Sequence, residues 1–140
     1  MTVLLVDVAN TVGARPDGWW RDRAGATFRL LGRLALLPGR TPAGPDGTPL
    51  PVTALVAVVE GRARDIAAPA GLRLVRAAGS GDDALVQVAA ELAGADLLVV
   101  TADRGLRARL PAGARTAGPG WLLTVTDQAA GADQEQDRRP

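Results

Sequence analysis

Several residue types that carry common enzyme chemistry are missing from this sequence. It contains no histidine, cysteine, tyrosine or lysine, so all 16 of its basic side chains are arginines. Without histidine there is no Ser-His-Asp or Cys-His nucleophilic system and no usual zinc site. Without lysine there is no Schiff-base chemistry and no P-loop cation. Carboxylates that act with a hard divalent cation are the chemistry that the remaining residue types support best.

Long apolar runs and a leader pattern are also missing. No apolar stretch reaches the ~20 residues that a helix needs to cross a bilayer, and the start of the chain passes directly into a strand pattern instead of a basic leader. The lack of cysteine removes any disulfide framework. We therefore expect a cytoplasmic protein that has no membrane association, and a length of 140 residues predicts one domain.

Short apolar runs alternate with helical patterns along the chain. Strands are predicted at 3–6, 52–59, 72–75, 97–100 and within 114–125. Helices are predicted at 19–37, 82–93 and 103–110. This alternation indicates the α/β class, as a three-layer α/β/α Rossmann-like domain with a parallel sheet and helices on both faces. The polar composition after residue 126 predicts a domain over 1–126 and a disordered tail over 127–140.

Acidic side chains follow three of the predicted strands. Asp7, Glu60 and Asp103 stand at strand ends, and Asp82 and Asp83 lie in the first turn of a predicted helix. The carboxyl ends of parallel strands meet at one rim of a sheet, which is where such sheets bind ligands. Neighbouring carboxylates there would repel one another unless a cation lay between them. The pattern therefore predicts a Mg²⁺ or Mn²⁺ site formed by these five acids.

Each of these acids also has a simpler interpretation. Asp82, Asp83 and Asp103 suit the N-terminal ends of helices, where carboxylates cap free N–H groups. Glu60 suits an ion pair with an arginine in the segment that follows it. Asp7 is harder to explain in this way, because no helix is predicted to begin at residue 8. The joint occurrence of acids at several strand ends favours the metal site over separate caps.

Other residues near these strand ends suit a supporting or substrate-binding role. Asn10 and Thr101 could orient a carboxylate or contact a phosphate, and Arg15 and Arg104 could hold phosphate oxygens. Further arginines with the same potential role are Arg21, Arg23, Arg62, Arg64 and Arg107. Trp19 and Trp20 suit either base stacking or the core, and Ser80 suits a helix cap better than a nucleophile.

Three segments together resemble a known family. They are Val6-Asp7-Val8-Ala9-Asn10, Gly81-Asp82-Asp83-Ala84-Leu85-Val86 and Val100-Thr101-Ala102-Asp103-Arg104. They resemble the three motifs of NYN domains, members of the PIN-like nuclease superfamily, in a small actinobacterial form. The resemblance implies sheet order 3-2-1-4-5 and metal-dependent ribonuclease activity, with Asp7, Asp82 or Asp83, and Asp103 as metal ligands. Glu60 has no counterpart in these motifs.

Two functions follow as expectations. The first is a Mg²⁺- or Mn²⁺-dependent endonuclease that hydrolyses RNA phosphodiester bonds. A homodimer is a possible assembly for it. The alternative is a catalytically inactive RNA-binding or regulatory module of the same fold. A haloacid-dehalogenase phosphatase is rejected, since Ala9 stands where its second aspartate belongs. A dinucleotide-binding Rossmann domain is not expected, because the turn after the first predicted strand of this sequence lacks the glycines that such a domain needs. The Trp19–Arg23 stretch also looks like actinobacterial proteins labelled nucleotide pyrophosphohydrolases, whose acidic helical repeats are missing here.

Overall fold

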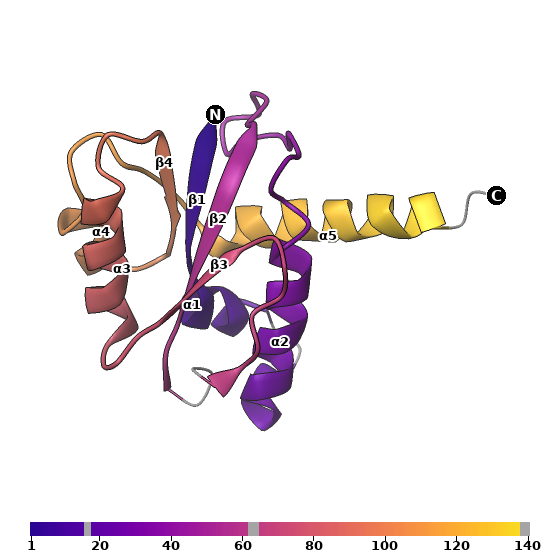
Figure 1. Cartoon of the computed structure of the whole chain (residues 1–140), viewed down its shortest axis with the longest axis horizontal. Helices are drawn as coiled ribbons and strands as arrows, with labels where there is room; N and C mark the ends of the chain where they lie inside the picture. The colour runs from indigo at the N-terminus through magenta and orange to yellow at the C-terminus, as the bar shows by residue number, and fades with distance from the viewer. Residues whose placement is uncertain (16–17, 62–64, 138–140) are drawn as a thin grey trace.

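A five-stranded parallel sheet forms the centre of the protein, which we describe from a computed structural model over residues 1–15, 18–61 and 65–137 (Figure 1). Its strands are β1 (Thr2–Asp7), β2 (Val52–Val59), β3 (Arg73–Arg76), β4 (Leu97–Val100) and β5 (Arg115–Ala117). They lie in the order β3-β2-β1-β4-β5, and all the pairings are parallel. The predicted α/β class and the strand order 3-2-1-4-5 are both confirmed.

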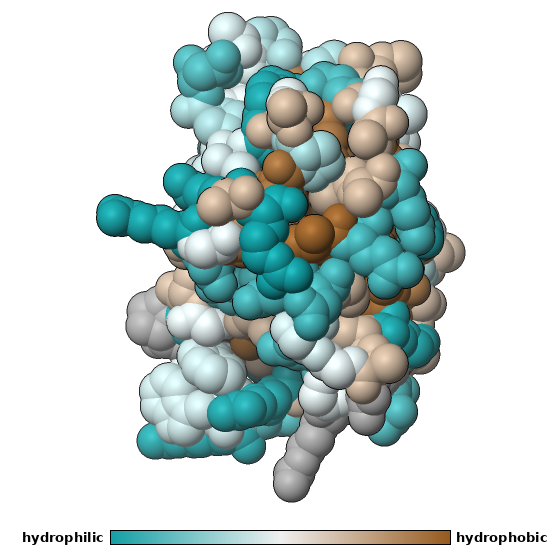
Figure 2. Space-filling model, turned by 90° about the vertical axis from the view of Figure 1, so that its left-hand side faces the viewer, coloured by the Kyte–Doolittle hydropathy of each residue, from teal (hydrophilic) through white to brown (hydrophobic). Residues whose placement is uncertain are grey.

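Helices cover both faces of the sheet. On one face lie α1 (Val8–Gly13), α2 (Arg23–Leu34) and α5 (Pro119–Asp137), and on the other lie α3 (Gly81–Glu91) and α4 (Arg104–Ala108) (Figure 1). The side of the molecule that carries α3 and α4 is largely hydrophilic around a small hydrophobic area (Figure 2). Among the described residues, no helix is both long enough and apolar enough to pass through a bilayer.

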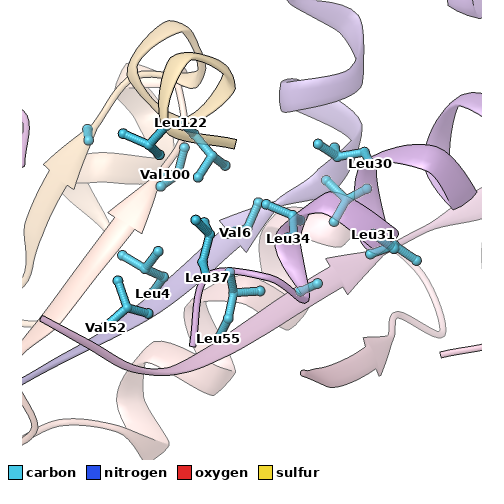
Figure 3. Packing of buried hydrophobic residues seen from close by; sticks show 14 of the residues in the cluster. Leu4, Val6, Leu30, Leu31, Leu34, Leu37, Val52, Leu55, Val100 and Leu122 are labelled. Atoms are coloured by element: carbon cyan, nitrogen blue, oxygen red, sulfur yellow. The ribbon is translucent and has the colours of Figure 1, made fainter. Parts of the chain in front are cut away.

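The central strand β1 supplies both halves of the core because its side chains alternate between the two faces. Leu4 and Val6 pack with α2 and α5 side chains such as Leu34 and Leu122 (Figure 3). Leu5 packs with α3 and α4 side chains in a second cluster. A strand covered on both faces reads as a continuous apolar run, which is why it was recognisable in the sequence.

Residues 8–13 form a helix that the sequence did not predict. The expectation that no helix begins at residue 8 is therefore wrong, and Asp7 is the N-cap of α1. This six-residue segment is rich in β-branched residues, which favour helices weakly. Val8, Thr11 and Val12 are nevertheless buried, and the Thr11 hydroxyl donates to the Asp7 carbonyl at 2.9 Å. Tertiary packing thus determines the conformation here.

The helix predicted over 19–37 is divided into two parts. A 3₁₀ turn, η1 (Trp19–Arg21), precedes α2, and the break falls at Asp22. The Asp22 side chain accepts a hydrogen bond from the Gly25 amide at 3.0 Å and so caps α2. Aspartate at this position satisfies a free N–H group of the first turn, and this local bond competes with a continuous helix.

The disordered tail predicted over 127–140 is wrong for residues 127–137, which belong to α5. The domain boundary expected after residue 126 therefore falls inside a helix, and residues 138–140 lie outside the described part of the chain. The last predicted strand is also shorter than its window, at Arg115–Ala117. Leu122, Val125 and Ala129 form the buried stripe of α5, and it packs against α1 and α2. This stripe is narrow and ends in alanine, so it left a weak signal in a polar sequence.

We expect Leu122→Ala to destabilise the fold by about 2–5 kcal/mol, because it removes a fully buried side chain and leaves a cavity between α5 and the sheet. Gln128→Ala in the same helix is the matched control, and it should change the free energy of unfolding by less than about 0.5 kcal/mol because Gln128 is exposed. Urea unfolding measures both. Equal effects of the two substitutions would contradict the packing of α5 on the sheet.

Candidate functional site

The strand register brings the predicted acids to one rim of the sheet. Val6 of β1 is level with Ala57 of β2 and with Val100 of β4, so the residues after them lie side by side. Asp7 is therefore next to Thr101, and Glu60 follows the end of β2 just beyond it. This rim is where β1 passes into α1, in the lower part of Figure 1.

Asp7 is partly buried and accepts two hydrogen bonds. Its Oδ1 accepts from the Asn10 amide at 3.2 Å, and its Oδ2 accepts from the Thr101 hydroxyl at 3.4 Å. Burial raises the pKa of Asp7 above its ordinary value, and the nearby charges of Asp82 and Glu60 raise it further. The hydrogen bonds from Asn10 and Thr101 oppose this rise. The carboxylate is thus held beside two others in a partly desolvated place.

Asn10 and Thr101 join the start of α1 to the loop after β4. The Asn10 side-chain carbonyl accepts from the Ala102 amide at 2.9 Å. Thr101 is fully buried, and its hydroxyl accepts from the Asp103 amide at 3.1 Å. Asp103 in turn caps α4, since its Oδ1 accepts from the Leu106 amide at 3.2 Å. The two polar residues therefore fix the relative positions of Asp7 and Asp103.

Glu60 and Asp82 approach from the other side of the rim. The Glu60 Oε2 accepts from the Gly81 amide at 2.5 Å, and a Cβ at position 81 would lie only 2.5 Å from that oxygen. A side chain at position 81 would require the Glu60 carboxylate to move away. Burial raises the pKa of Asp82, and the charges of Asp103 and Glu60 add to the rise, while Arg109 lowers it. Asp82, like Asp7, therefore lies near carboxylates that come from two other segments.

Asp83 is set apart from this group. It is exposed, and its Oδ1 lies 2.7 Å from the Arg109 Nη2 in an ion pair. Ser80 caps α3 by accepting from the Asp82 amide at 3.2 Å, as the sequence indicated. We refer to Asp7, Glu60, Asp82 and Asp103 as the rim acids. Across the described residues, no group of three or more acidic side chains is placed to hold a metal ion. The rim acids still affect one another through their charges, as the raised pKa values of Asp7 and Asp82 indicate.

The predicted phosphate-binding arginines occupy different surroundings. Arg15 pairs with Asp127 of α5 at 3.0 Å, and Asp127 also pairs with Arg33 at 2.5 Å. Arg104 is exposed at the start of α4, directly after Asp103. The remaining arginines are also spread over separate contacts. Arg107 donates to the Thr101 carbonyl, Arg21 and Arg23 lie over the Trp20 and Trp19 rings, and Arg62 and Arg64 are outside the described residues.

Beside the rim acids is a hollow of about 440 Å³ that sequence reasoning did not anticipate. It lies between α1, η1, α2 and the end of β2, and both Trp19 and Glu60 line it. Trp19 and Arg23 were the visible signal in the sequence. Their position at the hollow depends on the break at Asp22 and on the unpredicted helix α1.

Comparison with solved structures identifies a similar fold. The chain resembles a crystal structure of a mutant of Rae1 (YacP) from Bacillus subtilis with a TM-score of 0.69 at 17% sequence identity, over 99% of this chain and 82% of that one. No protein-family model matches the sequence, and no curated protein matches it. At this identity the likeness establishes the fold alone.

We expect Asp7→Asn to raise the unfolding temperature at about pH 7. The pKa of Asp7 is raised above its ordinary 3.8, so the native state holds this proton more tightly than the unfolded chain. Stability is therefore lost as pH rises from 3.8 through the native pKa, and above that range Asp7 destabilises the fold. Asparagine removes the charge and still caps α1. Thermal unfolding across pH should show a gain that vanishes in acid.

Asp96→Asn is a control in which the unfolding temperature should change in the opposite direction. Its pKa is lowered, chiefly by the hydrogen bond from Thr2 and also by Arg115, so its charge stabilises the native state. This stabilisation is present above the ordinary pKa and is lost as pH falls through the native one. The variant should unfold at a lower temperature than the wild type at neutral pH. A destabilised Asp7→Asn protein with the same pH trend as Asp96→Asn would contradict the raised pKa of Asp7.

Proposed function

We propose that this protein is a ribonuclease that hydrolyses RNA phosphodiester bonds with Mg²⁺ or Mn²⁺ held by the rim acids. The observation that carries the proposal is the mutual electrostatic effect of Asp7, Glu60, Asp82 and Asp103, which come from four separate segments. A fold has no structural need to bring repelling groups together at the ligand-binding edge of its sheet. The PIN-like fold and the three motifs support the same reading.

The chemistry of the rim acids fits a hard divalent cation. All the side-chain donors are carboxylate or hydroxyl oxygens, which are the ligands that Mg²⁺ and Mn²⁺ take in proteins. Burial chiefly, and the neighbouring carboxylates in addition, raise the pKa values of Asp7 and Asp82, and a positive ion beside them would oppose both rises. When bound, such an ion would polarise a phosphodiester and lower the pKa of a water molecule.

In this proposal, different residues bind the cation, position the metal ligands and bind phosphate. Asp7, Asp82 and Asp103 hold the cation, and Glu60 is a fourth acid at the edge of the group. Asn10 and Thr101 act as positioning residues, because their hydrogen bonds fix the loop that carries Asp103 relative to Asp7. Arg104 is exposed next to Asp103, where its guanidinium is available to a phosphate. Arg15 would have to exchange Asp127 for a phosphate to act in the same way.

The second candidate is an RNA-binding module of the same fold that cuts nothing. Two observations favour it. Asp7 and Asp103 already cap helices, and within the described residues no three acids form a ready metal-binding group. The two candidates differ in their need for metal. A nuclease loses activity with chelator, whereas such a module binds RNA equally well with or without divalent ions.

We expect purified protein to cleave single-stranded RNA with Mn²⁺ and to stop when EDTA is added. Asp7→Asn and Asp82→Asn should each lower the cleavage rate by at least about 100-fold, the scale on which loss of one group that stabilises charge in the transition state acts. Gel analysis of an end-labelled RNA measures the rates and separates internal from terminal cleavage.

Asp46→Asn is the matched control for charge. Asp46 accepts from Thr48 in the loop before β2, far from the rim in sequence and in the sheet, so its loss should leave the rate unchanged. If the wild type and all three variants cleave at the same rate, the nuclease proposal is refuted. RNA binding that persists in EDTA without cleavage would favour the second candidate.

A further inference from the structure

The hollow beside the rim acids has the size and lining of a ligand site. Its volume of about 440 Å³ falls within the ~300–1,000 Å³ that small-molecule sites occupy. Val8, Val12 and Val59 are buried and give it apolar walls, while Arg23 and Glu60 add one group of each charge. Val8 directly follows the first rim acid, so a ligand in the hollow would lie next to the proposed cleavage site.

Trp19 presents an aromatic ring that is held in place within this hollow. The ring is half-buried, and the Arg23 guanidinium carbon lies 5.2 Å from its centroid. Trp20 meets it edge-to-face with centroids 6.2 Å apart, and Gly13 lies close to its other end. A preorganised ring of this kind suits the face of a nucleobase, and an adjacent guanidinium adds to the attraction.

Glu60 supplies a hydrogen-bond acceptor in the wall of the same hollow. One of its oxygens is fixed by the Gly81 amide, which holds the carboxylate in a defined place. A carboxylate accepts from the exocyclic amino group of a base, as in contacts to N4 of cytosine. It opposes a base that presents a carbonyl oxygen at the same point, since two acceptors then face each other.

We infer that this hollow is a nucleobase-binding subsite, in which Trp19 stacks on one base of the RNA and Glu60 accepts a hydrogen bond from its amino group. Cytosine should therefore bind better than uracil. The inference rests on the proposed function only in taking RNA as the ligand that runs along the rim. It assigns Trp19 and Glu60 a part in substrate choice that the motifs do not contain.

Trp19 fluorescence tests this directly in a Trp20→Phe, Trp121→Phe background, where Trp19 is the remaining tryptophan. The probes are short single-stranded oligocytidylate and oligouridylate, together with the free nucleotides CMP and UMP, all in EDTA to prevent cleavage. We expect oligocytidylate to quench Trp19 and to bind more tightly than oligouridylate. The free nucleotides should show the same preference more weakly, because they lack the backbone contacts.

Substitutions then separate stacking from packing. Trp19→Ala should weaken oligocytidylate binding by about 10-fold, as measured by anisotropy of a labelled strand, and Trp19→Phe should restore most of it. Phe28→Ala is the matched control, since Phe28 is an exposed aromatic residue that does not line the hollow. Glu60→Gln should reduce the preference for cytosine over uracil, because an amide can donate to a carbonyl oxygen as well as accept.

Failure of the inference and failure of the proposed function give different results. If the protein cleaves RNA but oligocytidylate leaves Trp19 fluorescence unchanged and Trp19→Phe and Trp19→Ala bind like the wild type, the subsite is refuted and the nuclease stands. If nothing is cleaved but Trp19 is quenched with the expected preference, the subsite stands without catalysis. Quenching by CMP with none by oligocytidylate overturns the assignment to RNA.

Discussion

The position of β1 between β2 and β4 is the constraint on which the proposed site depends. Because all three strands run in the same direction, the segments that follow them emerge at the same rim. The chain carries Asp7, Glu60 and Asp103 on those segments, and the start of α3 adds Asp82. The backbone hydrogen bonds of the sheet and the apolar core behind it hold the charges together against their repulsion. This repulsion is the property that a cation would turn into binding energy.

Two of the rim acids, Asp7 and Asp103, are also the N-caps of helices. Asp7 and Asp103 each accept from the first turn of a helix, and those N–H groups partly offset the negative charge. Thr101 donates to Asp7 and accepts from Asp103, so the two caps are linked through one buried hydroxyl. The cap interpretation and the site interpretation of these acids are therefore compatible, because the local bonds are what orient them.

The sequence was sufficient to predict the strands of the sheet and most of the acids at its rim. Continuous apolar runs identified the buried strands, and acids directly after them could be placed by the parallel rule. The sequence did not show which side of α3 faces the rim. This matters because successive residues of a helix point about 100° apart. As a result Asp82 and Asp83 were equivalent in the sequence, whereas the structure turns Asp82 toward the other acids and pairs Asp83 with Arg109. Helix α1 was not predicted because tertiary packing overrides its weak helix propensity. The end of α5 was not predicted because its apolar stripe is narrow.

A divalent cation held by the rim acids would be visible in anomalous diffraction from a crystal soaked in Mn²⁺. We expect an anomalous peak within coordination distance of carboxylate oxygens of Asp7 and Asp82, together with movement of Asp103 toward it. Full soaking with no peak at the rim, while each acid keeps its local hydrogen bonds, would contradict cation binding by the rim acids.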